Sequence, residues 1–131
     1  MAFNAQQFDQ DKVNNGAWRE IMGGQFLIAR AGNERYLEAQ ERNGKRKATS
    51  AAERQRALYQ SIAEGILLDW RDVVDKDGKP IAYSVAAAVE VLSENPDLVS
   101  AILAEANDSE AYRREDIAEQ AKKPPKGSST G

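Results

Sequence analysis

The sequence predicts a mainly α-helical α+β domain, with about five helices and a small β-hairpin near the N-terminus. Between residues 50 and 106, apolar side chains recur at steps of three and four, which is the spacing of one buried helix face. Two short runs rich in aromatic and β-branched residues, 17–22 and 25–30, flank the Gly23-Gly24 pair and indicate the hairpin. The domain is expected over residues 16–122, between a flexible arm at 1–15 and a disordered tail at 123–131.

Residues that cap helices stand before most of the predicted helices. Ser50 and Glu53 form a capping box, in which each side chain accepts a backbone hydrogen bond that would otherwise be unmade. In Asn95-Pro96-Asp97, the asparagine can cap a helix, the proline suits its first position, and the acid favours its N-terminal dipole. The predicted helices are 34–41 after Asn33, 50–70, 85–94 after Ser84, 96–106, and a weakly apolar 110–122.

The predicted core is made of large apolar residues on these helix faces and of the two tryptophans, because burying an indole excludes a large apolar area. These residues are Trp18, Tyr59, Ile62, Ile66, Trp70 and Leu92.

Residues 65–84 form a junction between the two halves of the chain. Asp75-Lys76-Asp77-Gly78 resembles the start of a calcium loop, but with Gly78 as the sixth loop residue, Val73 and Ser84 would occupy essential ligand positions. A plain turn with Gly78 at positive φ is the preferred interpretation.

The composition weighs against an enzyme. Among 131 residues there is no cysteine and no histidine, so the chain lacks a thiol nucleophile, the commonest general base and the commonest metal ligands. Asp69 and Asp72, expected on one helix face, are the nearest approach to a catalytic pair and have no evident third group. No cofactor or metal is expected, and binding is favoured over catalysis.

The basic segment 42–56 is the one feature that suggests nucleic-acid binding, through Arg42, Arg46 and their neighbours. It contains no aromatic residue for base stacking, acidic residues flank it, and the net charge of the chain is -3. A solvated loop is therefore preferred, and an acidic protein partner is a further alternative. No run of residues is apolar enough for a membrane span, and no secretory signal is evident, so a cytoplasmic protein is expected.

From Gly16 to about Tyr112, the sequence resembles the tail assembly chaperones of bacteriophages with long, non-contractile tails. The most specific segment runs from Leu67-Leu68-Asp69-Trp70 through Val73, Asp75, Gly78 and Pro80 to Tyr83-Ser84. Further similarity lies in Gly16-Ala17-Trp18, residues 26–30, residues 33–37, Leu92, Asn95-Pro96-Asp97-Leu98 and Ile102.

The resemblance implies a non-enzymatic protein of the host cell cytoplasm that is absent from the mature virion. Such a chaperone binds the tape measure protein, keeps it soluble and promotes polymerisation of the tail tube protein around it. Many members also have a longer form made by ribosomal frameshifting.

Apolar stripes in the C-terminal half are the expected contact surface for such a partner, because helices can pack against the exposed stripes of another helical protein. The same surfaces would serve a homo-oligomer, although packing onto the 50–70 helix is the competing interpretation. The residues concerned are Leu98, Ile102, Leu103, Tyr112 and Ile117, with Arg42 and Arg46 as polar contacts.

Overall fold

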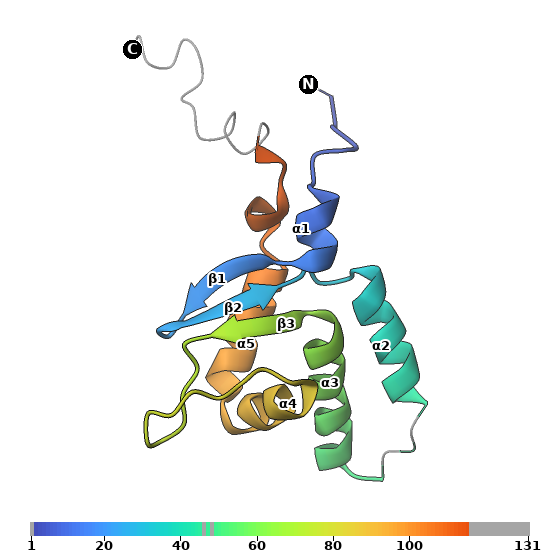
Figure 1. The fold of residues 1–131 in the computed structure, drawn as a ribbon. Helices are drawn as coiled ribbons and strands as arrows, with labels where there is room; N and C mark the ends of the chain where they lie inside the picture. The colour runs from blue at the N-terminus through green and yellow to red at the C-terminus, as the bar shows by residue number, and fades with distance from the viewer. Residues whose placement is uncertain (1, 46, 48, 116–131) are drawn as a thin grey trace.

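A computed structural model describes residues 2–45, 47 and 49–115. Within them, five α-helices, one short 3-10 helix and a three-stranded antiparallel sheet confirm the predicted mainly helical α+β fold (Figure 1). The elements are α1 (Gln10–Asn15), β1 (Ala17–Ile21), β2 (Gly24–Ile28), α2 (Glu34–Gly44), α3 (Ala51–Gly65), β3 (Leu67–Arg71), α4 (Val85–Glu94), α5 (Pro96–Ala106) and η1 (Ser109–Tyr112).

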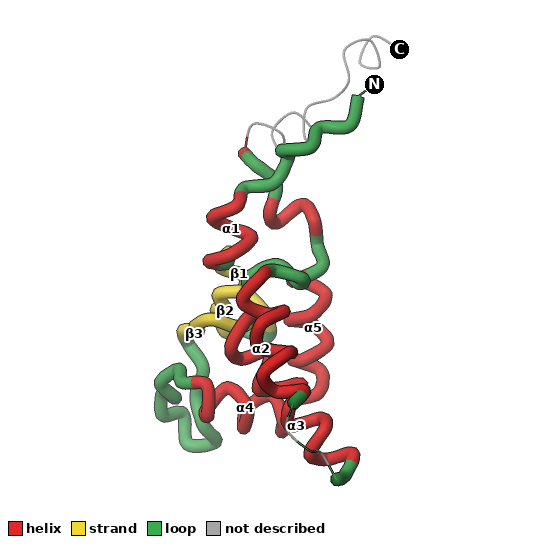
Figure 2. The backbone as a smooth tube through the Cα atoms, turned by 90° about the vertical axis from the view of Figure 1, so that its right-hand side faces the viewer, coloured by secondary structure: helices red, strands yellow, loops and turns green. Residues whose placement is uncertain are grey.

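The sheet, with strand order β1-β2-β3, lies above α3 and α4 in Figure 1, α5 runs behind it, and α2 packs beside α3. Figure 2, seen from the side, places α1 and the described N-terminal residues at one end of the molecule. The long connection between β3 and α4 lies towards the other end. None of the helices in the described part is long and apolar enough to cross a membrane.

Three of the predicted helix caps are confirmed. The side chains of Asn33, Ser50 and Ser84 accept hydrogen bonds from backbone N–H groups three residues ahead, at 2.9, 3.2 and 3.0 Å. The predicted cap at Asn95 is wrong, because its side chain donates instead to the Val91 carbonyl oxygen at 2.7 Å. Pro96 at the first position begins α5 without a side-chain cap.

The predicted hairpin is confirmed as β1 and β2, but its turn lies at Met22-Gly23, one residue before the predicted Gly23-Gly24 pair, because Gly24 is the first residue of β2. The predicted helix over 50–70 is wrong at its C-terminal end, since α3 stops at Gly65 and residues 67–71 pair with β2 as strand β3. The apolar spacing of Ile66, Leu67 and Trp70 suits either element, and a β-bulge near Leu67 lets both Leu67 and Trp70 face the core.

The N-terminal arm is more ordered than predicted. Residues 10–15 form α1, which Asp9 caps through its side chain. Asp9 N donates to the Tyr112 carbonyl oxygen at 2.8 Å, and Arg114 N donates to that of Gln7 at 2.9 Å, which joins the arm to the C-terminal region. The helix expected from residue 110 opens as the 3-10 helix η1 instead, and the predicted tail at 123–131 lies outside the described residues.

The core lies between the sheet and helices α3, α4 and α5. Of the residues expected there, Tyr59, Ile62, Ile66, Trp70 and Leu92 are buried. Trp18 is half-buried instead, because β1 directs it to the outer face of the sheet, where the Arg71 guanidinium lies 4.1 Å from its ring centre.

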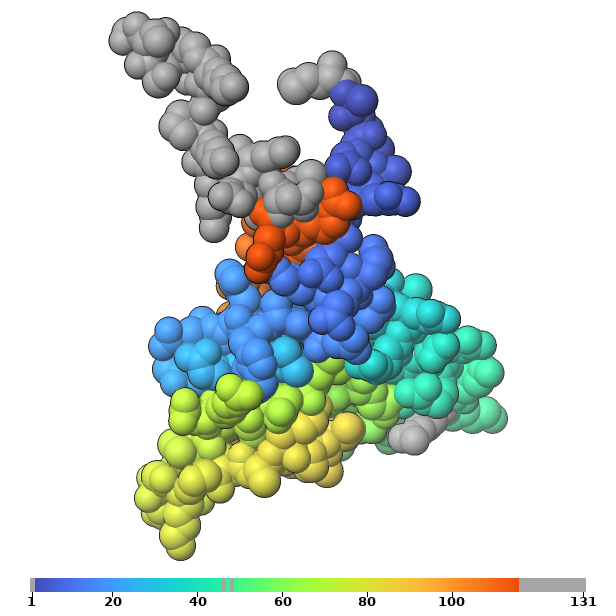
Figure 3. Space-filling model, turned by 45° about the horizontal axis from the view of Figure 1, so that its top comes forward, coloured from blue at the N-terminus to red at the C-terminus, as the bar shows by residue number. Residues whose placement is uncertain are grey.

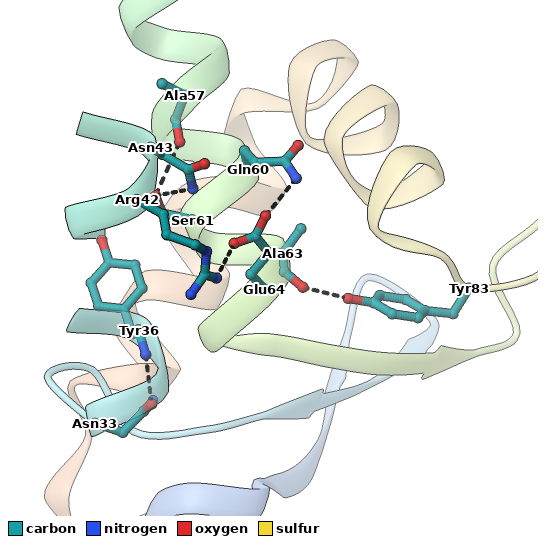
Figure 4. A network of polar contacts seen from close by, with 10 residues as sticks. All are labelled: Asn33, Tyr36, Arg42, Asn43, Ala57, Gln60, Ser61, Ala63, Glu64 and Tyr83. Carbon is teal, nitrogen blue, oxygen red and sulfur yellow. Dashed lines mark hydrogen bonds and ion pairs between the residues drawn. The ribbon is translucent and has the colours of Figure 1, made fainter. Parts of the chain in front are cut away.

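A polar network joins α2 to α3 (Figure 4). The buried Asn33 side chain donates to the Gly65 carbonyl oxygen at 2.8 Å, and Asn43 donates to the Ser61 hydroxyl at 2.9 Å. Partial burial favours the neutral form of Glu64, but hydrogen bonds from Gln60 and Arg42 outweigh that effect and lower the pKa of Glu64.

Gly65 lies at a close approach of these two helices, because a Cβ at this position would lie 2.6 Å from the Tyr36 backbone N. We expect Gly65→Ala to lower the free energy of unfolding by about 1–3 kcal/mol, since the backbone must move apart. Gly44→Ala is the matched control. A Cβ there meets nothing within 4 Å, so the higher helix propensity of alanine should stabilise α2. Urea unfolding of both variants measures the difference, and equal stabilities would contradict the close approach.

The Tyr83 hydroxyl lies 2.7 and 2.6 Å from the Ala63 and Leu67 carbonyl oxygens, and burial raises the pKa of Tyr83 to about 12. Because the pKa of Tyr83 is raised on folding, its hydroxyl contributes its full stabilisation below pH 10.0, the pKa of tyrosine in the unfolded chain. That contribution is lost as the pH rises through about 12. Tyr83→Phe should cost about 1 kcal/mol at neutral pH. Urea unfolding at increasing pH should show that the difference in free energy of unfolding between wild type and Tyr83→Phe becomes smaller above pH 10. A difference that stays constant would contradict the role given to the Tyr83 hydroxyl.

Candidate functional site

A cleft of about 610 Å³ opens where the β1–β2 turn, the segment after β3 and the α4–α5 junction meet. Figure 1 shows the hairpin turn and the 72–81 loop at the same side of the molecule. The described lining residues are Ile21, Met22, Gly24, Phe26, Asp72, Val73, Val74, Asp75, Lys76, Asp77, Ile81, Val91, Glu94, Asn95 and Leu98.

Apolar side chains form the floor of this cleft and part of its rim. Ile21, Phe26 and Leu98 are buried beneath it, whereas Met22 and Val74 are 71% and 52% exposed. Large apolar side chains that stay exposed beside an apolar floor are typical of a surface that contacts another molecule.

The 72–81 loop that forms one wall has a definite structure. Val74 forms a β-bridge with Pro80, and backbone hydrogen bonds of 2.8 Å join Asp75 to Lys79 and Ile81 to Val73. Figure 3 shows the loop as a yellow-green lobe that projects from the body.

The turn predicted at its tip is confirmed, with Gly78 at φ 79°. The Asp75 side chain accepts from the backbone N–H groups of Asp77 and Lys79 at 2.8 and 3.0 Å, so this carboxylate organises the turn.

Trp70 and Tyr83 anchor the base of this wall. Trp70 Nε1 donates to the Ile81 carbonyl oxygen at 2.7 Å, and the Trp70 and Tyr83 rings meet edge to face with centres 5.1 Å apart. The buried indole thus has its polar atom satisfied, and the loop is held against the sheet.

Two residues of the cleft have unusual backbone conformations. Met22 has φ 51° and Asp72 has φ 60°, and they are the two non-glycine residues with positive φ in the described ranges. Such conformations cost free energy and collect at functional sites. Their presence at one cleft supports its choice as the candidate site.

Most of the residues predicted to bind a partner lie elsewhere. Leu98, Ile102 and Tyr112 are buried in the protein's own structure, and Leu103 is half-buried. The expectation of a spare apolar surface on these residues is therefore corrected for the first three, because α5 and η1 use them for internal packing. Leu98 alone reaches the cleft, and Ile117 lies outside the described residues.

The basic segment is matched by carboxylates only in part, since Lys47 and Arg54 form no ion pair with another described residue. Arg42 pairs with Glu64 at 2.7 Å, as Figure 4 shows, and Arg56 pairs with Glu90. Arg46 lies outside the described residues. A second hollow of about 620 Å³ lies here, lined by Asn43, Gly44, Lys47, Glu53, Arg54, Arg56, Ala57 and Gln60.

The expectation that Asp69 and Asp72 share a helix face is wrong. Asp69 lies on β3, where its carboxylate accepts from Trp70 N at 2.8 Å, and Asp72 follows the strand at positive φ. Successive residues of a strand point to alternate faces of the sheet, and Asp72 lies beyond the end of β3. The two carboxylates therefore do not share a surface as they would on a helix.

Met22, Val74 and Ile81 are among the cleft residues that the sequence did not indicate as binding residues. Met22 alone leaves a local signal, since Met-Gly stands at a hairpin turn where Asn-Gly is the usual choice.

The fold and cleft define a small α+β domain with an apolar cleft at one end. Residues 21–123 match the model of the YdaY prophage protein family, which is most of the chain. The chain belongs to this family and is therefore a phage-derived protein. No curated protein and no solved structure matches the sequence.

The strain at Met22 gives a prediction about stability. Met22→Asn should raise the free energy of unfolding by about 0.5–1 kcal/mol, because asparagine adopts positive φ more readily and the exposed methionine contributes little packing. Met22→Leu is the control and should give no gain, since leucine keeps the unfavourable backbone. Chemical denaturation of the three proteins measures this, and a destabilised Met22→Asn variant would contradict it.

Proposed function

We propose that this protein is a phage tail assembly chaperone that binds the tape measure protein without catalysing a reaction. It keeps that partner soluble in the host cell cytoplasm and promotes assembly of the tail tube around it. The membership of a prophage family supports a role in a phage.

One observation carries the proposal. The segment from Leu67 to Ser84, which bears the most specific resemblance to tail assembly chaperones, forms one wall of the apolar cleft. It contributes the exposed Val74, and the exposed Met22 of the hairpin turn lines the same cleft. A holdase needs such an exposed apolar surface, because it must cover apolar stripes of its partner before assembly covers them.

The alternative of a nucleic-acid-binding adaptor that uses segment 42–56 has less support. Arg42 and Arg56 are both engaged by carboxylates, which would have to be displaced by phosphates.

Co-expression with the tape measure protein of the same phage tests the proposal. The soluble fraction of the tape measure protein should rise strongly, and the two proteins should purify together. The control is Trp70→Ala, which removes the indole that anchors the cleft wall and should abolish the effect together with cooperative unfolding. A tape measure protein that is equally soluble alone would refute the holdase role. If the protein instead binds nucleic acid in a salt-dependent manner, the nucleic-acid-binding adaptor is favoured.

A further inference from the structure

The rim of the cleft carries more negative than positive charge. Asp72, Asp75, Asp77 and Glu94 line it together with one cation, Lys76. None of these four carboxylates forms an ion pair with another described residue. Only Asp75 is occupied locally, by the backbone of its own turn.

Charge and apolar surface thus have a defined arrangement. The buried Phe26 and Leu98 side chains lie beneath, the exposed Met22 and Val74 stand at the edge, and the carboxylates are exposed beside them. A ligand that fills this cleft must bring an apolar group to the floor and positive charge to the rim, because electrostatic complementarity orients partners and excludes those of like charge.

We infer that this cleft binds an amphipathic helix of the partner that presents a large apolar side chain flanked by lysine or arginine. This inference rests on the proposed function and specifies which segments of the partner are recognised. Nucleic acids and anionic membrane surfaces do not fit, since their phosphates would meet the acidic rim.

The strained residues fit this role. An asparagine at position 22 would suit the turn better but would remove the unbranched, polarisable methionine from the edge of the cleft. Asp72, also at positive φ, places a carboxylate directly after the strand that forms the wall. The chain therefore accepts a backbone cost at position 22, where the cleft gains an apolar contact, and uses at position 72 an acidic residue that tolerates positive φ.

The test uses the full chain and overlapping peptides that tile the tape measure protein. Bound peptides should share a large apolar residue flanked by lysine or arginine. The triple variant Asp72→Asn, Asp77→Asn and Glu94→Gln should bind them about tenfold more weakly, and added salt should weaken wild-type binding far more than binding by this variant. Asparagine tolerates the backbone at position 72, and Asp75 is left unchanged to preserve its turn.

The matched control removes the same number of exposed carboxylates away from the cleft, through Glu20→Gln, Glu38→Gln and Glu41→Gln. It should keep wild-type affinity within about twofold, because these carboxylates do not line the cleft and the exposed ion pair of Glu41 with Lys45 contributes little. Val74→Ser should weaken binding equally at low and high salt, since it removes apolar contact.

The outcomes separate the two proposals. If the triple variant binds as tightly as the control, or if the bound peptides lack cations, the cleft inference is wrong even though the chaperone function stands. If the wild-type chain binds no peptide and leaves the tape measure protein insoluble, the proposed function fails, and the inference fails with it.

Discussion

The hydrogen bond from the Trp70 indole to the Ile81 carbonyl oxygen holds the 72–81 loop against strand β3 and so fixes one wall of the cleft. Trp70 is buried on the last strand of the sheet, and Ile81 lies on the return of the long loop. Tyr83 then packs edge-on against the indole, and its hydroxyl reaches carbonyl oxygens of α3 and β3. This small group of contacts fixes the positions of the sheet, the 72–81 loop and the start of α4 relative to one another. The shape of the cleft depends on those positions.

The features that the sequence predicts correctly are local ones. Caps at Asn33, Ser50 and Ser84, the hairpin, and the positive φ of Gly78 each depend on a few neighbouring residues. Strand β3 shows the limit of such reasoning. Ile66, Leu67 and Trp70 continue the spacing of a helix, and the chain leaves that helix because β2 offers hydrogen bonds that no local pattern encodes.

The candidate site is less predictable for the same reason. Residues near positions 22, 74 and 95 come from three separate segments and meet only when the hairpin packs beside the α4–α5 junction. The apolar residues of α5 illustrate the converse. Ile102 was expected at a partner interface, but an apolar stripe has the same pattern whether it faces a partner or the protein's own sheet, and here it is fully buried.

The pairing of the two ends of the described chain has a mechanical consequence. Phe8 and Arg113 form an antiparallel bridge beside α1, and the hydrogen bonds around it join residues from opposite ends of the described sequence. Tension applied through both ends would open these bonds one after another before it loaded the sheet. In Figures 1 and 2 this bridge region lies towards the opposite end of the molecule from the 72–81 loop. Tension on both ends of the described chain would therefore detach α1 before it reached the cleft.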